Sequence, residues 1–289
     1  MKKEASPIRR DMKFKVDPSK VMNWVGDDPF TNYLLNVGSM SFPKGERFFI
    51  DTMRAHSEFV ADDPKLKKDM SAFIGQEAMH GREHDIYNEA HEIQNPKAAA
   101  FQHKTTDLMI NTIKRFPRRY WLLSSAALEH LTAIFGGAYL EMHDTITPDD
   151  RCDPDYKAMW MWHALEETEH KAVVFDVYQK AYGDDSKLSN YLLRCFFLIT
   201  STILYMGSLF SSLFYLIYTR GELTDRKAWG KFYLGALKPI IVRISGDWLD
   251  WFKRGFHPWE HDNIIKLKEF EDYLGGVPSP FTIEPPTAQ

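Results

Sequence analysis

The sequence predicts an all-α protein. Apolar residues recur every three or four positions over most of the chain, which is the spacing of amphipathic helices. Turn formers such as Asp62-Asp63-Pro64 and Asn95-Pro96 separate these runs. No run alternates apolar and polar residues as a half-buried strand does, and no glycine-rich loop of the kind that holds phosphate is found.

The composition narrows the classes of protein to consider. With 289 residues, 44% of them hydrophobic, the chain is long enough to bury a large core. Its formal net charge of -4 gives no electrostatic reason to expect a nucleic-acid partner. Cys152 and Cys195 are far apart, so no disulfide framework is expected. The basic first residues lack the apolar stretch of a secretory signal, and we therefore expect a cytoplasmic protein.

Three parts are expected along the chain. Residues 1–40 form an N-terminal arm, residues 41–185 a four-helix bundle, and residues 186–289 a hydrophobic helix with C-terminal amphipathic helices packed on the bundle or on a membrane. The first bundle helix is expected to begin at Ser41, because a capping residue followed by Pro43 is typical of a helix start. Further helices are expected over 64–93, 97–115, 118–144, 154–183 and 260–273.

One stretch, WMWHALEETEHKAVVF at 160–175, contains the strongest functional pattern. His163, Glu167 and His170 fall at i, i+4 and i+7, so a helix places their side chains in one stripe. Large apolar residues flank the stripe, which indicates that it faces a packed interior, where these polar groups need partners or a metal ion. The alternative is a surface helix whose charged residues face water.

Acidic residues on three more predicted helices extend the pattern. Glu46 stands beside two phenylalanines, Glu77 and His80 form an E-x-x-H pair, and Glu129 lies in the middle of an apolar helix. An unpaired carboxylate buried there costs roughly several kcal/mol. The order Glu, E-x-x-H, Glu, E-x-x-H over four helices is an arrangement that holds two metal ions inside a bundle. The alternative is a polar network with a purely structural role.

This order of residues resembles the ferritin-like di-iron carboxylate superfamily over residues 42–180. The extra histidine in H-x-x-x-E-x-x-H at 163–170 resembles the p-aminobenzoate N-oxygenase type, in which a third histidine joins the usual ligands. Over its whole length, including FKRGFHPWEHD at 252–262, the chain also resembles a bacterial family of predicted metal-dependent hydrolases, although we find no hydrolase motif. The resemblance implies seven metal ligands, which are Glu46, Glu77, His80, Glu129, His163, Glu167 and His170.

The resemblance also implies an activity. We expect a di-iron oxygenase, with manganese or zinc as alternative metals, that uses dioxygen as co-substrate for N-oxygenation or C–H hydroxylation. Its expected partners are a small, apolar or lipid-like substrate and an electron donor. The expected assemblies of the chain include a homodimer. Two other functions remain open: a dinuclear metal-dependent hydrolase that activates a bridging water, and a non-enzymatic iron-binding protein.

Residues 195–218 form a second distinctive stretch, because they carry no charge between Arg194 and Arg220. As a helix they extend about 36 Å, which exceeds the bilayer core of about 30 Å. Serines, threonines and Gly207 dilute the apolar character. A span or shallow insertion in the inner membrane and a long helix buried against the bundle are both open.

Several other polar residues lie near the predicted ligands in the sequence. We expect His84 on a helix surface, with an eighth ligand or a hydrogen-bonding partner of a ligand as the alternatives. Glu166 and Glu169 are expected in solvent, and His130 packed in the interior. Asp176 lies too far round its helix to join the stripe, and its expected role is to orient a ligand on another helix.

Overall fold

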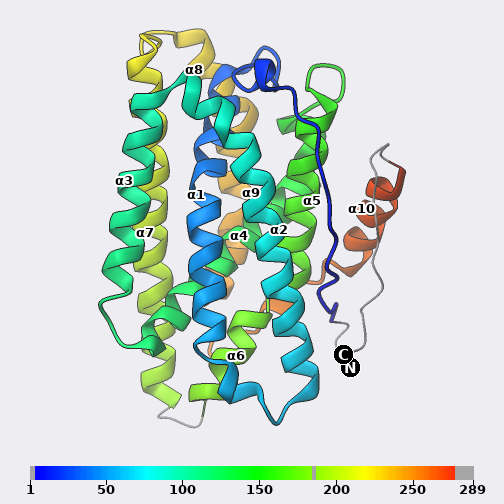
Figure 1. Cartoon of the computed structure of the whole chain (residues 1–289), viewed down its shortest axis with the longest axis vertical. Coiled ribbons are helices and arrows are strands. Elements are labelled where there is room, and N and C mark those ends of the chain that lie inside the picture. The colour runs from blue at the N-terminus through cyan, green and yellow to red at the C-terminus, as the bar shows by residue number, and fades with distance from the viewer. Residues whose placement is uncertain (1–3, 184–186, 277–289) are drawn as a thin grey trace.

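The computed structural model of the chain describes residues 4–183 and 187–276. Its regular elements are all helices, and neither range contains a β-strand (Figure 1). The prediction of an all-α bundle is therefore confirmed. The two ends of the chain, residues 1–3 and 277–289, lie outside the described residues, as do residues 184–186, so the outer limits of the predicted arm and C-terminal part are not seen.

Four long helices form the central bundle. α1 packs against α2 and α4 against α5, and contacts between α1 and α4 and between α2 and α5 close it. Capping aspartates open three of the four helices, and a proline follows each cap in the first turn. The bounds are Pro29–Arg54 for α1, Pro64–Gln94 for α2, Arg118–Ile146 for α4 and Pro154–His170 for α5.

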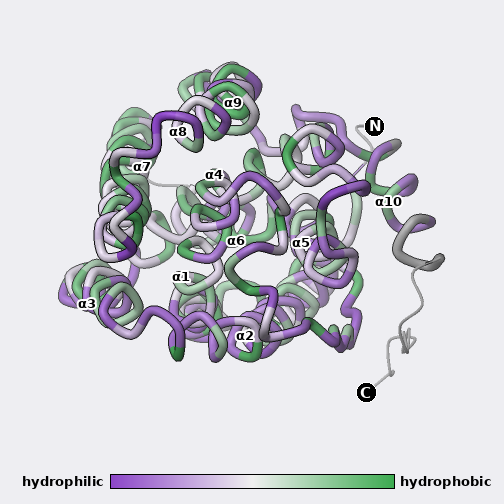
Figure 2. Tube along the Cα trace, turned by 90° about the horizontal axis from the view of Figure 1, so that it is seen from above, coloured by the Kyte–Doolittle hydropathy of each residue, from purple (hydrophilic) through white to green (hydrophobic). Residues whose placement is uncertain are grey.

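Shorter and outer elements surround this bundle. α3 and α7 pack beside α1, α9 packs on α4, and α10 packs on α5. Figure 2, seen along the bundle, shows α7 and α9 on the side of α4 that faces away from α2. The bounds are Pro96–Ile113 for α3, Val173–Tyr182 for α6, Lys187–Thr219 for α7, Arg226–Phe232 for α8, Lys238–Asp250 for α9 and Ile264–Gly276 for α10, with a π-helical segment at Tyr233–Leu237.

The predicted start of the first bundle helix at Ser41 is wrong. α1 begins at Pro29, where the Asp28 carboxylate accepts hydrogen bonds from the backbone and hydroxyl of Thr31. Pro43 lies inside the helix. Asp28 and Pro29 therefore provide a capping residue and a proline upstream of Ser41 and Pro43. Because residues 30–40 are buried against neighbouring helices, the helix continues through Ser41 and Pro43 instead of beginning there.

Apolar layers lie on both sides of the bundle's polar middle. Along α2, Met70 and Phe73 belong to one buried cluster, and Tyr87 and Ala90 belong to another. The acidic and imidazole residues predicted as ligands fall between these clusters in the sequence of the helix. The fold therefore holds its polar centre between two hydrophobic layers.

α7 is only partly covered by the rest of the protein. In its most apolar window only 17% of the residues are buried, so the alternative of a long buried helix is wrong. By length and composition alone, α7 is the one helix in the described part of the chain that could cross a membrane.

Gly136 brings α4 close to α5. A Cβ at Gly136 would lie 3.0 Å from the Ala164 carbonyl oxygen and 3.3 Å from Glu167 Cβ. The two helices therefore pack so closely that a Cβ at position 136 would have to push its neighbours on α5 aside.

We predict that Gly136→Ala lowers the free energy of unfolding by about 1–3 kcal/mol, because α4 and α5 must move apart. Gly207→Ala is the control: Gly207 is exposed in α7 and a Cβ there meets no atom within 4 Å. Helix propensity predicts a gain of up to about 1 kcal/mol for the control. Urea unfolding measures both, and equal stability changes would contradict the close packing.

Candidate metal centre

The structure brings the seven predicted ligands together inside the bundle. Each is at most 4% exposed to solvent. α1 contributes Glu46, α2 contributes Glu77 and His80, α4 contributes Glu129, and α5 contributes His163, Glu167 and His170. Four helices that are separate in sequence thus point acids and imidazoles at one region, as the order of these residues predicts.

Two groups within this region could each hold a metal ion. The three donor atoms of each group lie within 4.8 Å of one another. The first group is Glu46, His80 and His163, and the second is Glu77, Glu167 and His170. Glu129 adjoins the second group, because its Oε2 lies 3.3 Å from His170 Nε2. The first group is richer in imidazole and the second in carboxylate, so the two positions differ chemically.

Glu167 stands between the two groups. Its Oε1 lies 3.3 Å from His163 Nε2 and 3.7 Å from His80 Nδ1 on one side. On the other side the same oxygen lies 3.6 Å from His170 Nε2. A carboxylate in this position is suited to bridging two metal ions.

Hydrogen bonds outside the centre orient two of the histidines. His80 Nε2 donates to Glu166 Oε2 at 3.0 Å, which leaves the lone pair on Nδ1. Gln76 Nε2 donates to Glu169 at 3.0 Å, so the amide oxygen of Gln76 is free to accept from His170 Nδ1, also at 3.0 Å. These partners assign the tautomers of both rings and direct the lone pairs inward.

The third histidine is oriented by a longer chain of hydrogen bonds. Ser39 Oγ donates to Asn88 Oδ1 at 2.7 Å and therefore accepts from His84 Nδ1 at 2.8 Å. Burial lowers the pKa of His84 well below its usual range, so the ring is neutral and its Nε2 accepts from His163 Nδ1 at 2.9 Å. The lone pair of His163 consequently lies on Nε2, toward the centre. All three imidazoles thus donate outward, and a metal ion would take the inward nitrogen of each ring as a ligand.

The inward-facing atoms of the centre lack hydrogen-bond partners among the described residues. Buried polar atoms without partners are rare, because each costs roughly 1–3 kcal/mol. The unpartnered atoms are both carboxylate oxygens of Glu46, Glu77 and Glu129, together with Glu167 Oε2, His80 Nδ1 and His170 Nε2. Carboxylate oxygen and imidazole nitrogen are ligands that iron, manganese and zinc accept. The residues therefore fit a pair of such ions.

The charges of the centre also indicate cations. Burial, and then the carboxylates of Glu167 and Glu129, raise the pKa of Glu46 well above its usual range. Burial raises the pKa of Glu129 to about 7, although His170 counteracts this effect. Four carboxylates cannot all remain ionised so close together without positive charge, and divalent ions supply it.

The N-terminal arm places one arginine against the outer partners of the histidines. Arg10 Nη1 lies 3.2 Å from Glu166 Oε1, and Arg10 Nη2 lies 2.6 Å from Glu169 Oε1. The expectation that Glu166 and Glu169 are solvated is wrong, since they are 0% and 5% exposed. They are buried because Arg10 supplies a counter-charge from a segment more than a hundred residues away in sequence.

The structure corrects the expectations for two other residues and agrees with the expectation for a third. His84 is fully buried, so the expected surface position is wrong, and its hydrogen bond with His163 supports the alternative of a partner to a ligand. Asp176 bonds to His257 at 2.9 Å and orients no ligand. His130 is buried, as expected, and packs on Trp251.

Aromatic residues enclose the centre. Phe42 stacks on His163 with ring centroids 4.5 Å apart, and Phe73 meets His170 edge-on at 4.8 Å. Tyr205 of α7 is a neighbour that the sequence did not indicate. Burial raises its pKa to about 12, and its hydroxyl interacts with Ser41 near the carboxylates of the centre. Tyr205 therefore keeps its proton at neutral pH.

Fold and centre together define an all-helical bundle protein with buried histidine and glutamate clusters suited to metal ions. A family model described as "Predicted metal-dependent hydrolase" matches residues 8–262, and the chain belongs to this family. The match includes Arg10 and all four bundle helices. No curated protein and no solved structure matched the chain in the corresponding comparisons.

We predict that Gly81→Ala removes metal from the first group. A Cβ at Gly81 would lie 3.2 Å from Glu46 Oε2 and displace this carboxylate. Bound metal should fall from about two ions per chain toward about one. The control is Gly45→Ala, next to Glu46, where a Cβ meets no atom within 4 Å. Metal analysis of both purified variants decides, and identical metal contents would show that Gly81 provides no needed space.

We predict that Arg10→Ala is strongly destabilising, because Glu166 and Glu169 remain buried without their counter-charge. The free energy of unfolding should fall by about 3–5 kcal/mol, and metal affinity by about 10- to 100-fold. Arg9→Ala removes a neighbouring exposed arginine and should change stability by less than about 0.5 kcal/mol. Urea unfolding and metal titration measure these effects. If both variants behave alike, the arm does not support the centre.

Proposed function

We propose that this protein is a dinuclear metal enzyme that uses iron and dioxygen to oxygenate a small apolar substrate. One observation carries the proposal: three imidazole lone pairs and four carboxylates converge in a closed interior between apolar layers. Such a donor set matches ions that tolerate mixed nitrogen and oxygen ligation, and its excess of carboxylates favours iron or manganese over zinc.

The seven ligands divide naturally between two ions. The first group would hold one ion and the second group with Glu129 the other, and Glu167, whose Oε1 lies near histidines of both groups, would be a ligand shared between them. Four carboxylates balance the charge of two divalent cations, so the loaded centre is close to neutral. When bound, a reduced iron pair supplies the electrons and the binding sites for activating dioxygen.

The remaining residues have supporting tasks in this proposal. Glu166, Gln76 and His84 hold the imidazole rings in one orientation, so that the donor atoms stay in place through turnover. Phe42 and Phe73 cover the ligands and keep bulk water away. The protonated hydroxyl of Tyr205 is a hydrogen-bond donor close to the carboxylates. The aromatic enclosure favours an apolar substrate, and an external electron donor completes the reaction.

A dinuclear hydrolase is the second candidate, and the comparison with known families supports it better than the oxygenase. The matching family is described as metal-dependent hydrolases. Two divalent ions held by the same ligands would activate a water molecule between them for attack on an ester, amide or phosphate. A polar substrate would then have to reach a centre whose ligands are at most 4% exposed.

Metal analysis combined with oxygen exposure separates the two candidates. Protein purified without chelator is expected to contain about two iron ions per chain. After anaerobic reduction, exposure to dioxygen should produce a transient absorption band and consume dioxygen. Zinc in place of iron, with no oxygen-dependent band and with hydrolysis of ester or phosphate model substrates, would establish the hydrolase instead.

His163→Ala tests the ligand assignment. We expect it to lower metal content and to change the oxygen-dependent band, because the first group loses one of its two imidazoles. His103→Ala is the control, since His103 is partly exposed and pairs with Glu92 away from the centre. Unchanged metal content and oxygen reaction in His163→Ala would remove His163 from the ligand set.

A further inference from the structure

Exposed large hydrophobic side chains gather on α7 and α9. Both helices pack on α4 at the outside of the bundle, as Figure 2 shows, and Trp248 of α9 donates to Thr202 of α7 at 3.0 Å. Most exposed large hydrophobic residues among the described ones lie between Leu188 and Leu249. We call this the α7–α9 face; its members on α7 are Leu188, Leu192, Phe196, Ile199, Ile203, Leu204, Phe214 and Tyr218, and those further on are Leu223, Tyr233, Leu234, Ile241, Val242 and Leu249.

The exposed residues of α7 follow the period of the helix. Leu188, Leu192, Phe196, Ile199 and Ile203 are separated by four, four, three and four positions, so they form one stripe. No exposed residue of α7 between positions 188 and 218 is charged. A soluble protein rarely leaves so long an apolar stripe in water, and such a surface marks an interaction site.

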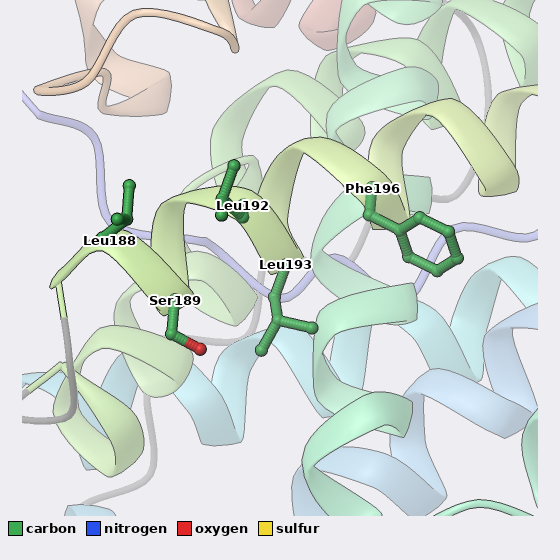
Figure 3. A pocket seen from close by; sticks show the side chains of 5 residues that line it. All are labelled: Leu188, Ser189, Leu192, Leu193 and Phe196. Carbon is green, nitrogen blue, oxygen red and sulfur yellow. The ribbon is translucent and has the colours of Figure 1, made fainter.

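A shallow hollow of about 460 Å³ lies at the beginning of this stripe. Leu188, Ser189, Leu192, Leu193 and Phe196 line it, and Figure 3 shows their side chains on the first turns of α7. Its lining is almost entirely aliphatic and aromatic, which suits a hydrocarbon chain better than a polar ligand.

The packing of α7 argues against a perpendicular span. Ser208, near the middle of the apolar stretch, donates to Thr105 of α3 at 2.9 Å, so this part of α3 lies at the same level. Lys104 and Asp107 are neighbours of Thr105, and Asp107 pairs with Lys44. A bilayer centred on α7 would enclose these charges, which is strongly unfavourable.

Basic residues accompany the apolar ones. Between positions 226 and 254 every exposed charged residue is basic, and these residues are Arg226, Lys227, Lys238, Lys253 and Arg254. Arg226 and Lys227 lie at the start of this segment, Lys253 and Arg254 at its end, and Lys238 between them. An apolar stripe with basic residues on one face is typical of helices that lie in the plane of an anionic lipid surface.

We propose that the α7–α9 face docks on an anionic lipid bilayer with α7 parallel to the membrane plane. Phe196, Ile203 and their neighbours enter the acyl boundary, and Arg226 and Lys227 contact lipid phosphates. This docking does not depend on the chemistry of the metal centre. A second copy of the chain suits this face less well than lipid does, because it would bring the same positive charges against it.

Vesicle flotation tests the proposal with the full chain. Wild type should float with vesicles that contain about one third phosphatidylglycerol and bind weakly to pure phosphatidylcholine. Phe196→Asp with Ile203→Asp should reduce flotation roughly a hundredfold, because two apolar anchors become charged. Arg226→Glu with Lys227→Glu should lower binding to anionic vesicles roughly thirtyfold and leave weak binding to neutral vesicles unchanged.

The matched control is Ile86→Asp with Ile93→Asp, a pair of exposed isoleucines with the same spacing on α2. It should float like wild type, and metal content should be unchanged in every variant. The proposal is overturned if wild-type protein stays in the lipid-free fraction. It is also overturned if the variant with Phe196→Asp and Ile203→Asp binds vesicles as fully as wild type. A lipid-independent dimer that this variant dissociates assigns the face to a second copy instead.

Discussion

The burial of four carboxylates in the middle of a helical bundle is the constraint on which the rest of the structure depends. Glu46, Glu77, Glu129 and Glu167 each come from a different helix and share a region closed to solvent. Burial and their mutual repulsion raise the pKa of Glu46 and Glu77 well above the usual range, so positive charge is needed to keep all four carboxylates ionised. Two divalent ions, with the imidazoles as neutral ligands, would supply this charge. Apolar layers on either side hold the helices at the distance that this compensation requires.

Hydrogen bonds to groups outside the centre fix the orientation of its histidines. Each inward-facing histidine donates a hydrogen bond to a group behind it, and two of these groups, Glu166 and Gln76, lead to the N-terminal arm. Arg10 therefore links the arm to the orientation of His80, although the two lie in different segments. The same arrangement explains why acids next to the ligands on α5 are buried: each has a partner that neutralises it.

Signals within a few residues of sequence predicted the helices better than they predicted what surrounds the ligands. Helix periodicity, caps and prolines predicted α2, α3 and α4 nearly as they occur, because those signals act within a few residues. They failed at Ser41, where tertiary burial extends α1 upstream. Glu166 and Glu169 looked like solvated residues, since their partner Arg10 is distant in sequence. For His84 the sequence favoured a surface position over a partner to a ligand, because its role depends on His163 of another helix.

The sequence by itself determined that the chain is helical and that acids and imidazoles recur on four helices, because both depend on spacing along one helix. It also determined the uncharged stretch at 195–218. Only the tertiary structure decided that the seven residues meet in two groups, which way each imidazole ring is turned, and that α7 leaves an apolar stripe exposed. These features depend on distances between helices, and the packing of whole faces sets those distances.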